Sequence, residues 1–145
     1  MANETEYPKL SFEQRVDTQL SSVTSIRWSG IDFDTDSALE WIEPAFLGLS
    51  PAASRKSARS ELWTWQFNCF AKIGEGGKST TRVHQLVDAV RAAFHQHDLA
   101  VNDWSGGSPG AVLYHIRLDE MQTIPIPSST QLQQINVTVS GWIHT

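Results

Sequence analysis

A glycine-rich stretch, GEGGKST at Gly74–Thr80, is the part of the sequence whose residue types first suggest a chemical task. Such a stretch between a strand and a helix can cradle nucleotide phosphates, because backbone N–H groups at a helix N-terminus bind anions. A strand-like run at Leu62–Ile73 precedes it, and a helix-like run at Thr81–His97 follows it. The spacing is wrong, since the phosphate-binding motif requires a glycine where this chain has Lys72. We therefore predict a glycine turn, with anion binding as the alternative.

Histidine and aspartate residues suggest metal sites, but their spacing does not support them. His84 and Asp88 share a helix face at i, i+4, yet no third ligand is identifiable. His95 and His97 are two apart and would point to different sides of a helix. The run DFDTD at Asp32–Asp36 alternates acids as calcium loops do, without the glycine and distal glutamate of an EF-hand. We predict no functional metal.

Nucleophilic side chains are equally sparse. Cys69 is the single cysteine, so the chain can form neither an internal disulfide nor a cysteine-based zinc site. It lies among apolar residues of a predicted strand, which favours a buried small side chain over a reactive thiol. Ser105 and Ser108 lie in WSGGSPG, which lacks the spacing of a G-x-S-x-G nucleophile elbow. We predict that the protein is not an enzyme and uses no cofactor.

The overall composition predicts one compact domain. The chain has 145 residues, 40% of them hydrophobic and 19% charged, with six Trp and six Phe to bury. The formal net charge of -5 argues against a protein whose main task is to grip phosphate backbones. No apolar run reaches membrane-spanning length, and the start, MANETEYPKL, lacks the apolar stretch of a secretory signal. We expect a soluble protein of a reducing compartment.

The first third of the chain predicts a short helix followed by extended segments. Ser11 and Gln14 have capping-box spacing, and apolar residues follow at helical spacing, so we expect a helix to open at Ser11. Residues 24–33, TSIRWSGIDF, predict a strand. A second extended run at 37–50 contains Pro44, which suits an edge strand or a bulge.

The middle of the chain carries a basic loop, the strongest strand and a second helix. Residues 50–60, SPAASRKSARS, are small, polar and basic and predict a long exposed loop. The strand that follows has one apolar face at period two, formed by Trp63, Trp65, Phe67, Cys69, Ala71 and Ile73. The helix after the glycine turn has one apolar stripe, formed by Val83, Leu86, Val87, Val90 and Phe94.

The last third predicts three more strands, at 99–104, 111–121 and 132–145, with the Pro-rich stretch 124–130 as a connection. Because only one strand leads into a helix, the parallel sheet of a phosphate-loop fold is not expected. The sequence predicts an α+β fold with a mostly antiparallel sheet and two helices packed on one face. We expect residues 1–9 to form a flexible arm and residues 10–145 a single domain.

The chain resembles the tail terminator proteins and related minor tail proteins of long-tailed bacteriophages, the group that includes the lambda tail terminator. The resemblance rests on Glu61–Phe94, ELWTWQFNCFAKIGEGGKSTTRVHQLVDAVRAAF, an aromatic-rich strand, a glycine turn and a helix. A helix precedes this core, and a late strand follows with V-x-V-x-G spacing at Val137, Val139 and Gly141. The order of elements matches over nearly the whole chain.

This resemblance implies a virion structural protein. Such proteins form a homohexameric ring at the head-proximal end of the tail tube, end its polymerisation and present the surface to which the head-completion or connector protein joins. DNA passes through the lumen without sequence-specific binding, and a net acidic protein suits passage rather than retention. The implied location is the tail or neck of the virion, after assembly in the bacterial host cytoplasm, with no membrane.

Loops are the expected contact regions within this hypothesis. Arg55, Lys56 and Arg59 of the basic loop could pair with acidic surface on a neighbouring subunit or the tube, or they could simply be solvated. Trp104 and Ser108, in the turn-rich loop before the predicted strand at 111–121, form a second candidate contact.

Two alternatives remain open from the sequence. One is a neighbouring head–tail joining or tail tube protein of the same assembly. The other, of a different class, is a small anion- or nucleotide-binding α+β protein that uses Gly74–Ser79.

Overall fold

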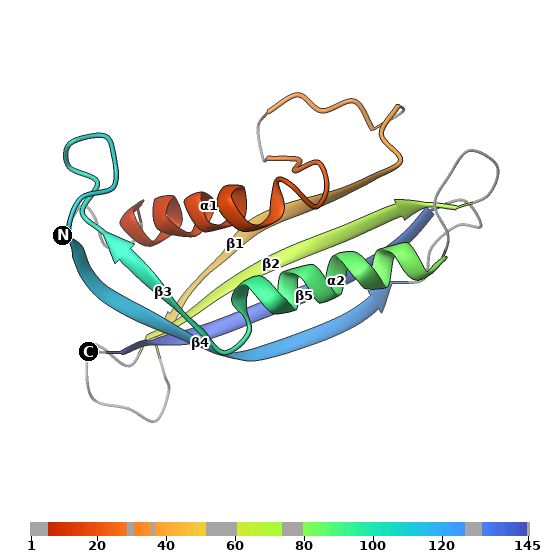
Figure 1. Ribbon diagram of the computed structural model, residues 1–145. Coiled ribbons are helices and arrows are strands. Elements are labelled where there is room, and N and C mark those ends of the chain that lie inside the picture. The colour runs from red at the N-terminus through yellow and green to blue at the C-terminus, as the bar shows by residue number, and fades with distance from the viewer. Residues whose placement is uncertain are drawn as a thin grey trace.

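A computed structural model describes residues 6–28, 31–35, 37–51, 61–73, 80–126 and 132–144 (Figure 1). The elements follow in the order α1 (Glu6–Leu20), β1 (Glu40–Pro51), β2 (Glu61–Lys72), α2 (Thr80–Phe94), β3 (His97–Asn102), β4 (Val112–Ile126) and β5 (Leu132–His144). Neither described helix is long and apolar enough to cross a membrane.

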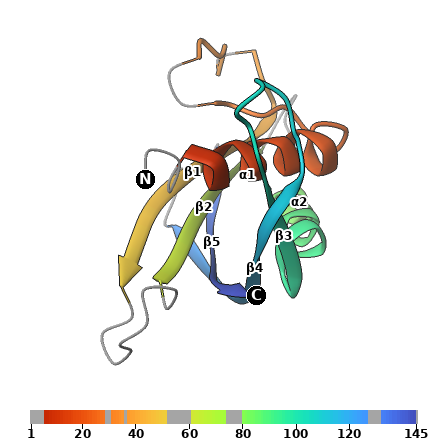
Figure 2. The same ribbon diagram turned by 90° about the vertical axis from the view of Figure 1, so that its left-hand side faces the viewer.

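The five strands form one antiparallel sheet in the order β1-β2-β5-β4-β3. Both helices lie on the same face of this curled sheet, with α1 against β3 and α2 across β2 and β5 (Figures 1 and 2). The predicted α+β fold, with a mostly antiparallel sheet and two helices on one face, is confirmed.

The core lies between the helices and the sheet, and the alternation of β2 builds its floor. Trp63, Trp65, Phe67, Cys69 and Ala71 are all at most 1% exposed, as the period-two pattern predicted. The predicted stripe of α2 is buried as well, through Val83, Leu86, Val87, Val90 and Phe94. Burying each large apolar side chain contributes about 1.5–3 kcal/mol, so this interface dominates the stability of the fold.

The first helix begins earlier than predicted. It starts at Glu6, so Ser11 is not its N-cap, and residues 6–9, expected in a flexible arm, form its first turn. Pro8 is tolerated there because the first N–H groups of a helix lack intrahelical partners. Tyr7 and Pro8 are buried and extend the apolar face by a turn, which explains the earlier start.

The predicted strand at 24–33 is wrong. This segment makes one isolated parallel bridge, between Ile26 and Ile42, and then leaves the sheet. The bridge has two hydrogen bonds, from Ile42 N to Ser25 O at 3.0 Å and from Arg27 N to Ile42 O at 2.9 Å. A turn follows at once, since Ile31 N donates to Trp28 O, and so no ladder can grow.

Strand β1 is an edge strand, as Pro44 predicted. The backbone groups of Ile42 point away from β2, toward Ser25 and Arg27. Pro44 lies two residues further along and points the same way, so its missing N–H leaves a gap in the outer edge rather than in the ladder. A bulge between Phe46 and Gly48 adds a second irregularity to this edge.

Two boundaries later in the chain also differ from the prediction. Helix α2 ends at Phe94, and His97, expected on that helix, is the first residue of β3. The turn between them places Gln96 in the left-handed region, at φ 61°. Strand β4 continues through Ile126 into the stretch expected to be a connection, because Pro125 still pairs with Ile135 of β5.

Gly141 is required where β4 and β5 approach each other. The register between them shifts from Arg117 to Glu120, which marks a bulge in β4 opposite Gly141. A Cβ atom at Gly141 would lie 2.2 Å from the carbonyl oxygen of Arg117 and 3.0 Å from Cα of Leu118. Both obstacles are backbone atoms, so no side chain can move aside.

We expect Gly141→Ala to lower the free energy of unfolding by about 1–3 kcal/mol, as overpacking does in tight interiors. Urea denaturation monitored by circular dichroism measures this change. Gly106→Ala is the matched control, because a Cβ atom there meets nothing within 4 Å. Equal stability of the two variants would contradict the close approach at Gly141.

Candidate functional site

One end of the sheet collects both regions that the sequence suggested as contacts. The register pairs Pro51 with Glu61, Leu62 with Trp142, and Trp142 with Arg117. Four parts of the chain therefore lie at the same end of the sheet, on the left in Figure 1. They are the end of β1, the start of β2, the end of β5 and the β3–β4 connection. We call residues 103–113, at this place, the loop end.

The basic residues of the second predicted loop lie outside the described residues. Arg55, Lys56 and Arg59 follow Pro51 and precede Glu61 in the sequence, so the chain leaves and re-enters the sheet at the same end as residues 103–113. The glycine stretch Gly74–Ser79 also lies outside the described residues. Strand β2, which precedes it, ends at Lys72 beside the start of β5, at the opposite end of the sheet from Leu62.

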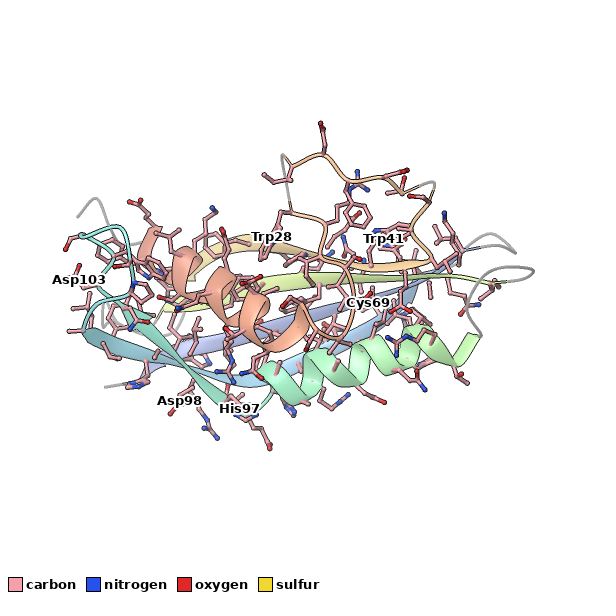
Figure 3. All side chains as sticks on the ribbon, turned by 45° about the horizontal axis from the view of Figure 1, so that its top comes forward. Trp28, Trp41, Cys69, His97, Asp98 and Asp103 are labelled. Atoms are coloured by element: carbon pink, nitrogen blue, oxygen red, sulfur yellow. The ribbon has the colours of Figure 1, made fainter. Side chains whose placement is uncertain are left out.

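The β3–β4 connection is held by its own backbone hydrogen bonds. Asp103 N donates to Ala111 O at 2.9 Å, Gly110 N donates to Asp103 O at 2.8 Å, and Gly107 N donates to Trp104 O at 2.9 Å. Gly107 has φ 81°, in the region that glycine reaches at little cost. The loop end is therefore a defined structure, and Figure 3 shows Asp103 at the extremity of the molecule.

Ser11 of α1 attaches this connection to the body of the protein. Its Oγ accepts hydrogen bonds from Asn102 N and from Trp104 Nε1, both at 3.0 Å, and Ser11 is only 3% exposed. The Trp104 ring is half-buried against the core, so this predicted contact residue anchors the loop as well. Ser108, the other predicted contact residue, is exposed. Their contact role stays a prediction.

Asp103 carries the charged side chain of the loop end. Its carboxylate accepts a hydrogen bond from Ser105 N at 2.9 Å. This bond, followed by contacts with the Ser105 hydroxyl and the Tyr7 hydroxyl, lowers the pKa of Asp103 below its usual value. Burial, and then the charges of Asp103 and Glu6, raise the pKa of Tyr7. Tyr7 therefore stays a neutral donor toward an ionised Asp103 at neutral pH.

Apolar side chains are exposed beside this loop. Val112 and Leu113, the first two residues of β4, are 49% and 53% exposed. They point to opposite faces of the strand, because successive strand residues alternate. We call this pair the tip.

An apolar hollow of about 500 Å³ lies on the other side of α1, between this helix, the segment after it and β1. Its apolar lining is formed by Phe12, Trp28, Ile31, Pro44, Ala45 and Phe46. We call it the groove. Figure 3 shows Trp28 where the segment passes beside the helix. Within this lining Ile31 is 64% exposed, whereas Phe12 is only 2% exposed and belongs to the core.

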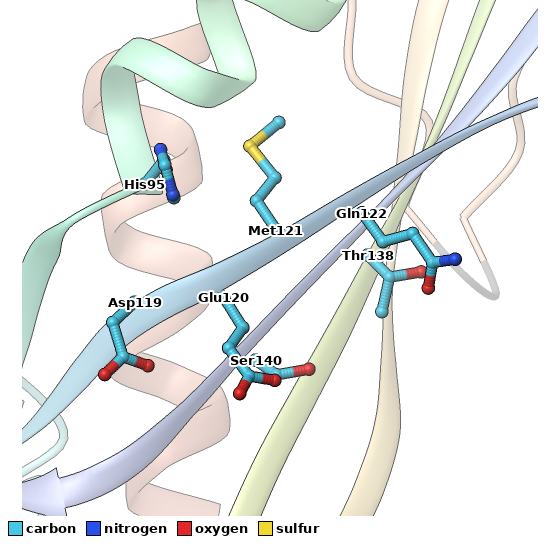
Figure 4. Close-up of a pocket in the computed structure, with 7 residues that line it drawn as sticks. All are labelled: His95, Asp119, Glu120, Met121, Gln122, Thr138 and Ser140. Atoms are coloured by element: carbon cyan, nitrogen blue, oxygen red, sulfur yellow. The ribbon is translucent and has the colours of Figure 1, made fainter.

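A second hollow, of about 440 Å³, lies at the β4 bulge (Figure 4). His95 and Met121 lie on the side of α2, whereas Glu120, Thr138 and Ser140 project from the other side of the strands. Asp119 contributes a second carboxylate to the lining, and in Figure 4 both carboxylates point away from α2.

The remaining sequence candidates are separated in the structure. His84 and Asp88 are exposed on α2, and among the described residues no three potential metal ligands come together. Asp34 accepts hydrogen bonds from Ser37 N and Oγ, which makes it part of a local turn. Cys69 is fully buried, as predicted, and burial raises its pKa to about 12, so it is a poor nucleophile.

Sequence reasoning missed two structural features. Ser11 accepts hydrogen bonds from Asn102 and Trp104, which lie 91 and 93 positions later in the sequence, and no local pattern encodes these contacts. Arg82 donates two hydrogen bonds from Nε and one from Nη2 to the Glu40 carboxylate, and a fourth to Val23 O. This network fixes the start of α2 against β1 and the end of α1, and it raises the pKa of Arg82.

We expect Ser11→Ala to leave Asn102 N–H and Trp104 Nε1–H without their acceptor. An unpaired buried donor costs about 1–3 kcal/mol, so the free energy of unfolding should fall by that amount. Urea denaturation measures it. Ser108→Ala, at an exposed serine of the same loop, should change stability by no more than about 0.5 kcal/mol. If the two variants are equally stable, Ser11 does not hold the loop.

We expect stability to depend on pH through Asp103. Because its pKa is lower in the folded than in the unfolded protein, its ionised form stabilises the fold above the unfolded value and this stability is lost as pH falls through the folded value. Below about pH 4 the urea midpoint of the wild type should therefore fall more steeply than that of Asp103→Asn. Asp119→Asn, at an exposed carboxylate outside the loop, is the control. Parallel pH profiles of wild type and Asp103→Asn would contradict this assignment.

Comparisons with known proteins show the fold. No family model and no curated protein matches the chain. Among the solved structures with a similar fold is one with a TM-score of 0.60 and 16% sequence identity, matched over 94% of this chain and 96% of the other. At this identity the likeness concerns the arrangement of helices and strands alone.

Proposed function

We propose that the protein is a phage tail terminator: a virion structural protein that forms a ring on the head-proximal end of the tail tube, ends its polymerisation and presents the surface for head joining. The observation that carries the proposal is the gathering of contact features at one end of the sheet. The fixed loop, the exposed tip and both ends of the basic segment 52–60 lie there. A protein that stacks on a tube needs such a one-ended surface.

The order of elements supports the same proposal. The core of the resemblance to tail terminators, a strand followed by a helix within Glu61–Phe94, corresponds to β2 and α2. Among the described residues a helix precedes this core and strands follow it, whereas the additional strand expected at 24–33 is absent. The functional groups of the described residues also suit contact rather than chemistry, since the hollow at the β4 bulge separates His95 from the nearby carboxylates.

The charge distribution is compatible with DNA passing through a ring. Lys72 and Arg117 lie on the sheet face that the helices leave uncovered. Lys72 Nζ donates to Thr35 O at 2.6 Å, and Arg117 Nη1 lies 3.4 Å from the Asp98 carboxylate. The net charge of -5 opposes retention of DNA.

We expect negative-stain images of the concentrated protein to show rings with six-fold symmetry and an open centre. Added to a polymerising tail tube protein, it should shorten the tubes, and rings should occur at one tube end only. Bovine serum albumin at equal concentration is the control for nonspecific effects on tube length. Particles of single-chain size, both alone and with tubes, would refute the proposal, and incorporation along the tube would favour a tube protein instead.

A further inference from the structure

The segment between α1 and β1, residues 24–39, is a loop whose two ends are held together by one side chain. Arg82 Nη2 donates to Val23 O at 3.1 Å, just before the segment, and to Glu40 Oε2 at 2.8 Å, just after it. A surface loop whose ends lie close together is an Ω-loop. Figure 1 shows an arch from the end of α1 to the start of β1. We call this loop the clasp, and its described residues are 24–28, 31–35 and 37–39.

The clasp covers the outer edge of β1 at Ile42. Ile42 N donates to Ser25 O at 3.0 Å, and Arg27 N donates to Ile42 O at 2.9 Å. Both outward backbone groups of Ile42 are therefore bonded to the clasp. An uncovered strand edge presents such groups to the extended segments of other chains. The clasp thus occupies the place at which another strand would pair with this edge.

The clasp also covers an aromatic pair on the sheet face that the helices leave uncovered. Trp41 and its register partner Phe70 project from this face and stack with centroids 5.0 Å apart. Trp41 is nevertheless only 4% exposed, and the ring of Phe33 lies 6.0 Å from it. Lys72 Nζ donates to Thr35 O at 2.6 Å and holds the clasp on the same side. The clasp therefore shields both the edge of β1 and its outer face.

Weak contacts hold the described part of the clasp, compared with those that hold the sheet. Arg27 Nη1 lies 2.7 Å from Glu43 Oε1, but these side chains are 45% and 24% exposed, and such ion pairs contribute little. Ile26 and Trp28 are only partly buried against the core. Strand β2, in contrast, is paired along its length with β1 on one side and β5 on the other. Segments with few buried contacts open at a lower free energy than the whole protein unfolds.

We propose that the clasp opens as one unit about the base that Arg82 closes, while the five-stranded sheet and both helices stay folded. Opening uncovers the outer edge of β1 at Ile42 and the ring of Trp41. Closing covers both again, so any pairing of another chain with this edge requires the clasp to open first. The inference concerns a single chain and is independent of the proposed ring.

Amide hydrogen exchange of the native protein, followed residue by residue by NMR, tests this opening. The N–H groups of Arg27 and Ile42 are the donors of the bridge, so one opening event should release both with equal opening constants. We expect these constants to exceed that of Phe67 in β2 by about tenfold or more. Glu43 is the control within β1, because its N–H points toward β2 and should stay protected like that of Phe67.

Two variants of the clasp itself sharpen the test. Phe33→Ala removes the aromatic cover of Trp41 and should raise the opening constants of Arg27 and Ile42 by about tenfold, with that of Phe67 unchanged. Ile31→Ala is the matched control, because Ile31 belongs to the same loop and is 64% exposed. It should change the same opening constants by less than about threefold.

Three outcomes would overturn the proposal. If Arg27 and Ile42 exchange no faster than Phe67, the clasp opens only when the whole protein unfolds. If Glu43 exchanges together with them, β1 itself leaves the sheet and the clasp is not a separate unit. If Arg27 and Ile42 have unequal opening constants, the bridge breaks in steps rather than as one unit.

Discussion

The packing of Phe12 against the aromatic face of β2 is the interaction on which the rest of the structure depends. Its ring stacks on Trp65 with centroids 4.9 Å apart and an interplanar angle of 11°, and it meets Phe67 and Phe94 at 5.4 Å. This cluster joins the sheet to both helices at one point, because Phe94 belongs to α2. It fixes where α1 lies, and with it the neighbouring residue Ser11 that holds the loop end.

Local pattern was sufficient for the elements whose own residues decide their structure. The period-two alternation of β2 and the apolar stripe of α2 both correspond to the buried faces, and Pro44 identified β1 as an edge. These signals work because burial on one side imposes a repeat of two on a strand and of 3.6 on a helix. The fold class followed from them.

Long-range partners were beyond the reach of the same reasoning. Ser11 resembles an N-cap by residue type and by its spacing from Gln14, yet its hydroxyl serves Asn102 and Trp104. The segment 24–33, whose pattern predicted a strand, forms only one β-bridge, because the chain turns at Trp28. The groove is lined by α1, this segment and β1 together, so no single stretch of the sequence predicts it. Contact surfaces of this kind are set by packing between distant elements rather than by motif.

The adjacency of Ser11 and Phe12 has a mechanical consequence. Ser11 is hydrogen-bonded to the β3–β4 connection, which leads to the tip, and Phe12 lines the groove. Consecutive residues of one helix therefore contact both features. A shift of α1 would move both together, and neither could adjust alone.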